Sequence, residues 1–263
     1  MLEIAYTMHR GKVSRQQQDG LLVKGAIHQA PALAVKTQHL LENEALLAVA
    51  DGVYSSHQPQ RASRSALEAL AEVVQQHPER LTEGGLINGW HLRRVQERLA
   101  NRLAVQPDTY GSSTTIAVAQ IQGSRAAILN VGDSRVYQAK RDGAWQRLSK
   151  DHTVLQGLID KGEASPDQNY ASLYGMLEYV LCADHESEDF ALHRVVVALE
   201  AGDWLVLCSD GVHDELGEER MWALFDPERE VGAQVKVWRD AVWAHGARDN
   251  FSLIVAKMIL DAA

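Results

Sequence analysis

The chain of 263 residues is 46% hydrophobic and 23% charged, and its 35 acidic against 26 basic side chains give a formal charge of −9. This composition is typical of a globular protein with a sizeable core. The acidic balance argues against nucleic-acid binding, which needs a broad basic surface. A ligand that carries phosphate would need divalent cations or a local arginine cluster, because bare carboxylates repel phosphate.

No linker-like stretch divides the sequence, so residues 1–263 are expected to form a single domain. The two cysteines, Cys182 and Cys208, are interpreted as reduced and packed, which favours a cytoplasmic location. Residues 1–12 lack the apolar core of a signal peptide, and no segment approaches the roughly 18 apolar residues that span a membrane. We therefore expect no membrane insertion.

Two kinds of apolar pattern predict the secondary structure. Short runs rich in Val, Ile and Leu, bounded mostly by Gly, Asp or Ser, are typical of buried strands. In chain order these runs are residues 46–50, 114–119, 126–131, 135–139, 190–198, 204–208 and 251–258. Apolar stripes at helical spacing indicate helices. These stripes run through residues 62–74, 92–103, 154–159 and 231–244.

The order of the elements favours one fold class. Residues 114–119, 126–131 and 135–139 follow one another through connections too short for crossover helices, which disfavours an alternating βαβ fold. Two packed sheets with helices outside accommodate this order better. We expect an α+β fold, a four-layer α/β/β/α sandwich of two packed, mostly antiparallel β-sheets flanked by helices.

Carboxylates recur at the ends of the predicted strands. In chain order they are Asp51, Asp133, Asp210 and Asp249. A single Asp-Gly pair is usually a turn. Several carboxylates at the ends of buried strands are different, because each unpaired ion costs on the order of several kcal/mol to desolvate. Oxygen ligands without a Cys/His set favour Mg²⁺ or Mn²⁺ as the compensating ions.

Six short motifs extend this pattern along the chain. They are Ala50-Asp51-Gly52, Gly111-Ser112-Ser113-Thr114, Val131-Gly132-Asp133-Ser134-Arg135, Asp151-His152-Thr153, Leu207-Cys208-Ser209-Asp210-Gly211 and Arg248-Asp249-Asn250. In this order and approximate spacing they resemble the protein phosphatase 2C family, from about residue 11 to residue 255. Each motif alone is weak, whereas the ordered set is strong.

The resemblance implies a bacterial-type, metal-dependent phosphatase that hydrolyses phosphoserine and phosphothreonine in proteins. Two divalent cations, Mn²⁺ or Mg²⁺, would activate the attacking water between them, and no covalent phosphoenzyme would be required. The implied partners are a phosphorylated protein substrate and an opposing serine/threonine kinase in a signalling system. We expect a monomer in the cytoplasm.

The resemblance also implies which residues hold the ions. Asp51 would bridge the two ions, and the carbonyl of Gly52 would complete one metal shell. Asp210 and Asp249 resemble ligands of the other ion. The predicted catalytic set consists of Asp51, Asp210, Asp249 and Arg15.

Two further aspartates resemble auxiliary members of the metal centre. Asp19 resembles the acidic residue that holds metal-bound waters in the family. Asp133 with Asp210 resembles a third, weaker metal site described for bacterial members. The expected cofactor content is therefore two ions, with a third at the weaker site.

The N-terminal motif departs from the family. Gly11 and Asp19 are in register, but Ser14 stands where the family has an arginine that holds the substrate phosphate. Arg15 lies one residue later, and in a strand that offset turns a side chain to the opposite face unless a bulge intervenes. Two interpretations of Arg15 remain open, phosphate contact and a solvated arginine. Lys12 is a second candidate for the phosphate.

Other positions near the motifs carry weaker signals. The family's eukaryotic branch has a histidine proton donor after its first Asp-Gly, whereas residues 53–56 offer no general acid here. His57 is interpreted as a surface or packed histidine, His152 as a structural hydrogen-bonding residue, and His213 as a loop histidine that could also approach the metals. Residues 155–189 correspond to the variable flap of the family, for which substrate contact and a plain surface connection are both open.

Two alternative functions remain open. One is a catalytically weak pseudophosphatase that acts as a phosphoprotein-binding adaptor, which the out-of-register arginine favours. The retention of three carboxylates that are costly to bury argues against it. The other is a hydrolase of a small phosphorylated metabolite or nucleotide, which the absence of a Gly-x-x-x-x-Gly-Lys phosphate loop disfavours.

Overall fold

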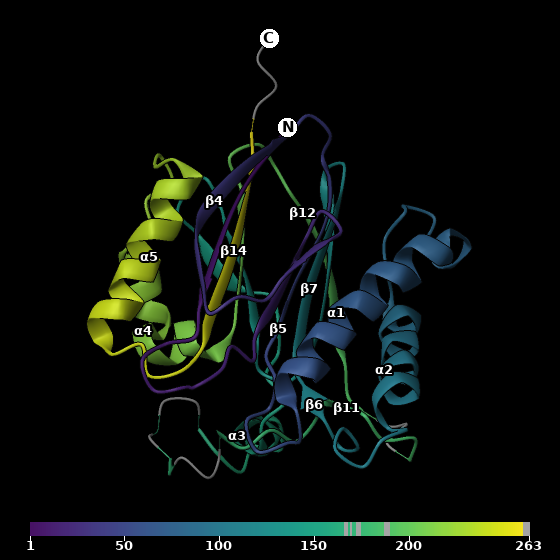
Figure 1. Ribbon diagram of the computed structural model, residues 1–263. Helices are drawn as coiled ribbons and strands as arrows, with labels where there is room; N and C mark the ends of the chain where they lie inside the picture. The colour runs from purple at the N-terminus through teal and green to yellow at the C-terminus, as the bar shows by residue number, and fades with distance from the viewer. Residues whose placement is uncertain (166–167, 169, 172–174, 187–189, 260–263) are drawn as a thin grey trace.

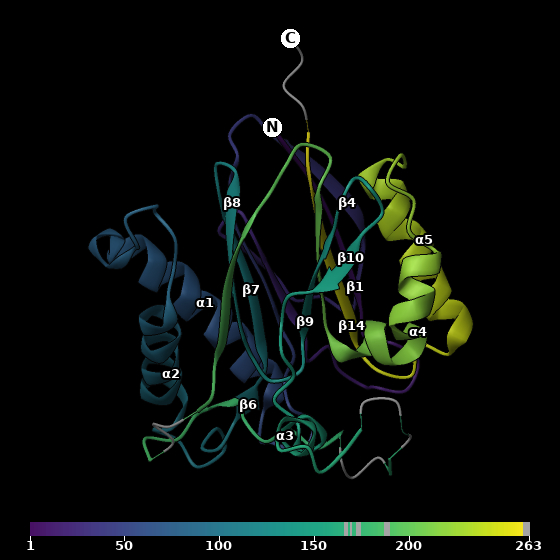
Figure 2. The same cartoon turned by 180° about the vertical axis from the view of Figure 1, so that it is seen from behind.

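The computed structural model describes residues 1–165, 168, 170–171, 175–186 and 190–259. Two six-stranded β-sheets face each other at the centre, and helices cover the outer face of each sheet (Figures 1 and 2). Every strand pairing among the described residues is antiparallel. The expected α+β four-layer sandwich is therefore confirmed.

The first sheet joins strands from both ends of the chain. Across it lie β10 (Trp145–Arg147), β9 (Arg135–Ala139), β13 (Trp204–Cys208), β14 (Phe251–Met258), β1 (Leu2–His9) and β4 (Ala32–Leu40). Helices α4 (Asp210–Ala223) and α5 (Val231–His245) cover its outer face (Figure 1). The layer between them contains a stacked aromatic pair, Phe225 and Trp238.

The second sheet is built from strands of the N-terminal half together with one later strand. Across it lie β12 (His193–Ala198), β8 (Arg125–Val131), β7 (Ile116–Gln122), β5 (Glu44–Ala50), β2 (Gly20–Val23) and β3 (Ala26–His28). Helices α1 (Pro59–Gln76) and α2 (Gly89–Leu103) cover its outer face (Figure 2). The short strands β6 (Ser113–Thr114) and β11 (Leu181–Cys182) pair beside it.

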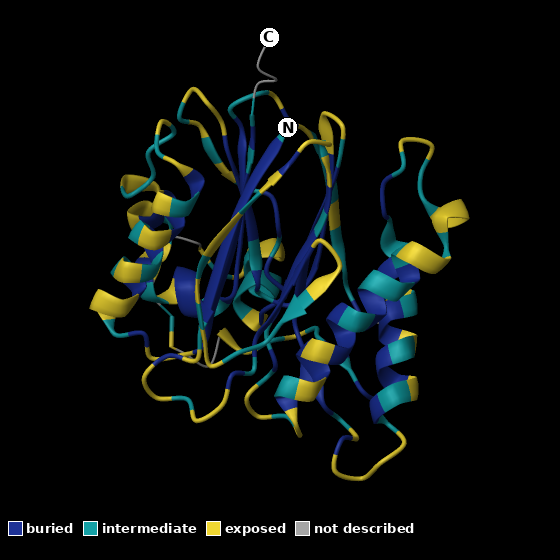
Figure 3. Cartoon of the chain, turned by 45° about the horizontal axis from the view of Figure 1, so that its top comes forward, coloured by how far each residue is buried: buried dark blue, intermediate teal, exposed yellow. Residues whose placement is uncertain are grey.

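Three apolar layers hold the sandwich together. The central layer lies between the sheets and includes Leu47 and Ile128 from one sheet and Leu205 and Ile254 from the other. The two outer layers fill the space between each sheet and its helices. Figure 3 shows the central strands and the inner helix faces as buried, and the outer helix faces and edge strands such as β4 as partly exposed. Burial of apolar area of this kind is the dominant favourable term in folding.

The helices follow their sequence patterns closely. In α1 the predicted stripe is buried, with Ala66 and Leu70 fully covered, and Pro59 occupies the first turn, where its missing N–H costs nothing. Before α2, Asn88 caps the helix, because its side chain accepts a 3.0 Å hydrogen bond from the N–H of Trp90. The shorter elements are η1 (Pro78–Arg80) and α3 (Val154–Asp160).

Some elements differ from the sequence prediction. The four strands β1 to β4 were not among the predicted runs, and the run 190–198 begins as a strand only at His193. Helix α4 starts at Asp210, where the sequence suggested a strand end followed by a loop. The predicted flap, 155–189, lies partly outside the described residues. In the described part of the chain, no helix has the length and apolar character needed to cross a membrane.

Candidate metal centre

The strand-end carboxylates gather at one end of the sandwich. Asp51 follows β5, and Asp133 lies in the turn between β8 and β9. Asp210 begins α4 directly after β13, and Asp249 precedes β14. All four line one hollow of about 100 Å³, together with Gly52. Both sheets therefore contribute predicted metal ligands to the same place.

A second hollow adjoins the first. It has a volume of about 190 Å³ and shares Asp210 and Asp249 with its neighbour. Its other lining residues are Gly211, Asp214, Glu215 and Arg248. The two shared carboxylates thus form the wall between the two hollows.

Burial and mutual repulsion act on four carboxylates of this centre, those of Asp19, Asp51, Asp133 and Asp210. Burial raises the pKa of Asp51 well above its usual value, and the charges of Asp19 and Asp210 add to the shift. Burial, with repulsion from Asp210, also raises the pKa of Asp19 to about 7 and that of Asp133 to about 7. Burial raises the pKa of Asp210 as well. A bound cation would oppose all of these shifts.

Two buried oxygen atoms mark the centre as a candidate cation site. Oδ1 of Asp19 and Oδ1 of Asp210 are buried and have no hydrogen-bond partner among the described residues. Buried polar atoms in proteins are nearly always paired, so such atoms need an explanation. The side-chain donors are all carboxylate oxygens, the ligand type that Mg²⁺ and Mn²⁺ prefer. The residues present therefore fit hard divalent ions.

The centre is not a closed cage. Among the described residues, no three carboxylate, histidine or cysteine side chains are arranged so that they could hold an ion by themselves. This agrees with the chemistry of Mg²⁺, which keeps several waters and usually takes only one or two carboxylates from the protein.

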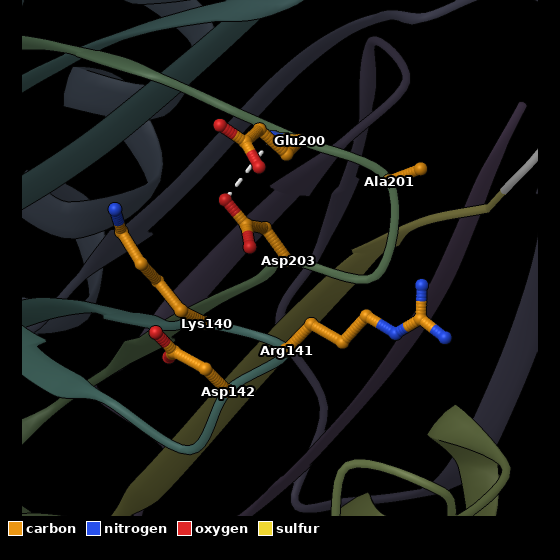
Figure 4. A pocket seen from close by; sticks show the side chains of 6 residues that line it. All are labelled: Lys140, Arg141, Asp142, Glu200, Ala201 and Asp203. Atoms are coloured by element: carbon orange, nitrogen blue, oxygen red, sulfur yellow. Dashed lines mark hydrogen bonds between the residues drawn. The ribbon is translucent and has the colours of Figure 1, made fainter.

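A larger hollow of about 470 Å³ lies at the opposite ends of β9 and β13 and has a different character. Figure 4 shows its lining residues, Lys140, Arg141, Asp142, Glu200, Ala201 and Asp203. The carboxylate of Asp203 accepts hydrogen bonds from the side chain of Gln138 at 3.0 Å and from the N–H of Glu200 at 3.1 Å. The protein itself satisfies this carboxylate, so it does not require a cation.

The Gly-Ser-Ser-Thr motif supports the backbone of Asp51. The hydroxyl of Thr114 donates to the carbonyl of Asp51 at 2.8 Å, and the N–H of Asp51 donates to the hydroxyl of Thr115 at 3.2 Å. Gly52 must be a glycine, because an added Cβ would lie 2.4 Å from the carbonyl oxygen of Pro59. These contacts fix the main chain on both sides of the predicted bridging carboxylate.

Asn250 ties the N-terminal loop to the centre. Its side chain donates to the carbonyl of Arg10 at 2.8 Å and accepts from the N–H of Gln18, so it holds both ends of the loop 10–18. Within this loop, the hydroxyl of Ser14 donates to Oδ1 of Asp249 at 3.3 Å. In the sequence, Asn250 belongs to a motif but shows no sign of this role, and Ser14 stands out only as the position of a missing arginine.

The two predicted phosphate-contacting cations lie outside the hollows. Arg15 is exposed and lines neither hollow. Residues 11–19 form a loop and not a strand, so an offset of one residue does not by itself turn the side chain of Arg15 to the opposite face. The ammonium group of Lys12 donates to the carbonyl of Trp243 at 3.0 Å and lies 4.8 Å from the centre of its ring. Contact of Arg15 with phosphate stays a prediction.

The three histidines have distinct surroundings. The ring of His152 accepts a 3.0 Å hydrogen bond from the N–H of Gly132, which confirms a structural role, and burial lowers the pKa of His152 to about 4. His57 is exposed. The prediction of a loop position for His213 was wrong, because this residue is buried in α4, with Nε2 3.1 Å from the carbonyl oxygen of Asp133. It buttresses the turn that carries this aspartate.

Comparison with known families decides the relationship that this geometry suggests. Residues 32–239 match the model of the family described as protein phosphatase 2C. The chain belongs to the protein phosphatase 2C family. The matched span contains Asp51, Asp133 and Asp210, whereas Asp19 and Asp249 lie on either side of it.

Curated members of the protein phosphatase 2C family are similar over most of the chain. The serine/threonine protein phosphatase PstP of Mycobacterium tuberculosis is 30% identical over 217 residues, which are 81% of this chain and 40% of that protein. The chain thus spans less than half the length of this relative. The serine/threonine phosphatase stp of Listeria monocytogenes is 26% identical over 82% of this chain and 85% of that protein.

Solved structures of bacterial phosphatases share the fold. The structure of M. tuberculosis PstP/Ppp has a TM-score of 0.78 at 24% identity and covers 99% of this chain and 100% of that one. Stp1 from Staphylococcus aureus has a TM-score of 0.80 at 18% identity, with 100% and 96% covered. The PstP catalytic domain in complex with two manganese ions has a TM-score of 0.71 at 24% identity, with 99% and 100% covered.

Proposed function

We propose that the chain is a metal-dependent serine/threonine protein phosphatase, a phosphomonoester hydrolase that acts on phosphoserine and phosphothreonine. The observation that carries this proposal is the gathering of Asp51, Asp133, Asp210 and Asp249 around one hollow, where Asp210 keeps a buried oxygen with no partner. Family membership supports it, and so do two relatives named as serine/threonine phosphatases.

The proposed cofactors are two Mn²⁺ or Mg²⁺ ions, with a third, weaker site. The residues that would hold them are Asp19, Asp51, Gly52, Asp133, Asp210 and Asp249. A relative of known structure binds two manganese ions. When bound, such ions lower the pKa of water and neutralise the charge of a phosphate group.

The side chains around the hollow define what the protein contributes to hydrolysis. Ser209 holds Oδ2 of Asp19 through a 2.8 Å hydrogen bond, which leaves Oδ1 of Asp19 to accept a hydrogen bond from water. The described lining residues include no cysteine or histidine that could form a phosphoenzyme. Cys208 is fully buried, and burial raises the pKa of its thiol, so it is not a nucleophile. Direct attack by water fits these surroundings.

The size of the hollow favours a phosphate group carried on a larger molecule. A volume of about 100 Å³ is small beside that of a site that encloses a whole ligand, so part of a larger substrate would lie outside. The exposed side chain of Tyr54 lines the same hollow and offers an aromatic surface to that outer part. A phosphorylated protein segment satisfies both conditions.

Several further features belong to the same proposal. The chain would act as a single domain over residues 1–263, with 155–189 as a substrate-contacting flap. A cationic side chain would contact the phosphate, and Arg15 is the candidate that the sequence offers. Its proposed partners are a phosphoprotein and an opposing serine/threonine kinase, and its proposed state is a cytoplasmic monomer.

The adaptor alternative keeps one specific observation in its favour. Ser14 occupies the position of the family's phosphate-holding arginine and bonds to Asp249 instead. Turnover of p-nitrophenyl phosphate and of a phosphothreonine peptide separates the two functions. The phosphatase proposal expects hydrolysis with Mn²⁺ or Mg²⁺ and its loss in Asp51→Asn. Metal binding without any hydrolysis would instead favour the adaptor.

A further inference from the structure

The substrate phosphate of the proposed phosphatase needs a cationic side chain that the N-terminal loop does not place in the hollows. Ser14 is uncharged and bonds to Asp249. Lys12 is engaged with Trp243, and Arg15 lines neither hollow. A phosphate bound among several carboxylates would gain from a guanidinium, whose planar N–H fork matches phosphate geometry.

Arg248 is the cationic residue among the lining residues of the two hollows. It lines the second hollow with Asp210 and Asp249, the two carboxylates that this hollow shares with the first. Arg248 also precedes Asp249 directly in the chain, so its main chain is anchored to a predicted metal ligand. A phosphate bound next to Asp210 and Asp249, between the two hollows, would lie in the region that Arg248 lines.

Glu215 orients the guanidinium. Oε1 of Glu215 accepts from Nε of Arg248 at 2.9 Å and from its main-chain N–H at 2.9 Å, and Oε2 accepts from Nη2 at 3.3 Å. The side chain of Glu215 is only 5% exposed, whereas that of Arg248 is 75% exposed. A buried carboxylate that holds one edge of an exposed guanidinium has the form of a positioning contact.

The other edge of the guanidinium is available to a ligand. An arginine side chain carries five N–H donors. Glu215 takes the donor on Nε and one on Nη2, and Nη1 has no hydrogen-bond partner among the described residues. Nη1 and the second N–H of Nη2 together can form two parallel hydrogen bonds to phosphate oxygens.

We propose that Arg248, oriented by Glu215, binds the phosphate group of the substrate and replaces the arginine that is missing at Ser14. This assignment rests on the proposed phosphatase function. It makes Arg248 a phosphate-binding residue and Glu215 a positioning residue. An exposed ion pair without a ligand is the competing description, since such pairs contribute little by themselves.

Steady-state kinetics of hydrolysis of a phosphothreonine peptide test the assignment in saturating Mn²⁺. Arg248→Ala should raise KM by about tenfold, because a charge-assisted hydrogen bond is lost. The inhibition constant of inorganic phosphate should rise by the same factor, while kcat changes by less than about twofold. Arg248→Lys should recover part of the loss, and Glu215→Gln should give an intermediate rise in KM.

Two controls separate phosphate binding from general damage. Arg239→Ala removes a half-buried arginine on α5 that pairs with Asp240 and lines neither hollow, so KM should stay unchanged. The Mn²⁺ concentration for half-maximal activity should be the same in Arg248→Ala and the parent protein, since Arg248 is not a metal ligand. A rise in KM for Arg15→Ala, with none for Arg248→Ala, would overturn the assignment.

Calorimetry with inorganic phosphate and Mn²⁺ keeps the test independent of turnover. Weaker phosphate binding in Arg248→Ala than in Arg239→Ala supports the assignment even in a protein that hydrolyses nothing, which would defeat the proposed function alone. Equal phosphate affinity in both variants, or no phosphate binding by the parent protein, contradicts the role of Arg248.

Discussion

The hydroxyl of Ser209 donates a 2.8 Å hydrogen bond to Oδ2 of Asp19, joining residues 190 positions apart in the chain. Ser209 follows β13 of the first sheet, and Asp19 precedes β2 of the second. The same hydroxyl accepts a 3.0 Å hydrogen bond from the N–H of Ser252. One side chain therefore fixes the buried carboxylate of Asp19 at the junction of the two sheets.

Removal of this hydroxyl should weaken both the fold and the metal centre. Ser209→Ala leaves a buried carboxylate oxygen without its donor, so the free energy of unfolding should fall by about 1–3 kcal/mol. Urea unfolding with and without Mn²⁺ measures the change, and Ser55→Ala, at an exposed position, is the control. Equal stability of the two variants would contradict the role of the Ser209 contact.

The stability of the metal-free protein should fall as pH rises. Asp19 and Asp133 have folded-state pKa values of about 7, against an ordinary value of 3.8. Between these values the folded state binds more protons than the unfolded state, so the free energy of unfolding decreases with pH. Protonation of Asp19 and Asp133 thus stabilises the folded state near pH 4, and this stabilisation is lost as the pH rises through 7.

Thermal unfolding in a chelating buffer measures this dependence. The midpoint temperature should decrease between about pH 4 and pH 7, and added Mn²⁺ should raise it more at pH 8 than at pH 5. Asp133→Asn should flatten the metal-free profile. A midpoint temperature of the metal-free protein that rises with pH across this range would contradict the prediction.

Substitution of the central aspartate should separate stability from activity. Asp51→Asn removes a carboxyl group whose ionisation is opposed by burial and by the charges of Asp19 and Asp210, so the metal-free protein should become more stable while hydrolysis falls by at least about a hundredfold. Asp203→Ala is the matched contrast, because its carboxylate is satisfied by hydrogen bonds. This variant should lose stability and keep its kcat. The opposite pattern would show that the first carboxylate is merely structural.

The contacts of Asn250 with the loop 10–18 should affect ion binding. Asn250→Ala removes the side-chain contacts to both ends of the loop 10–18, so Ser14 loses its fixed position beside Asp249 and the segment that leads to Asp19 is released. We expect the Mn²⁺ concentration for half-maximal activity to rise by about tenfold, in line with the loss of supporting contacts around metal ligands. A Mn²⁺ titration of activity checks this, with Asn101→Ala on α2 as the control. If the Mn²⁺ concentration for half-maximal activity stays unchanged, the contacts of Asn250 have no role in ion binding.

Local patterns predicted much of the fold because many strands are buried on both faces. Continuous Val, Ile and Leu runs marked β5, β8 and β13, and helical stripes marked α1 and α2. Strand β1 was not predicted because Glu3, Thr7 and His9 interrupt its apolar residues. Its pairing with β14 on one side and β4 on the other stabilises it as a strand. The start of α4 was missed because an Asp-Gly pair favours a turn in isolation, and packing on the sheet decides otherwise.

The candidate site was predictable where its residues follow strands. Asp51, Asp133 and Asp210 are visible as carboxylates that interrupt apolar runs. The contacts that hold the site are not visible in the same way. Ser209 reaches Asp19 across 190 positions, and Ser14 reaches Asp249 across 235, and no local pattern signals such pairs. Only the folded structure shows which polar residues form hydrogen bonds with the carboxylates.

Metal-dependent hydrolysis of a phosphothreonine peptide tests the central claim most directly. Released phosphate should appear when Mn²⁺ or Mg²⁺ is added to metal-stripped protein, disappear with excess chelator and return when the metal is restored. Undiminished hydrolysis in excess chelator would contradict the account, because the clustered aspartates would then have no part in the reaction.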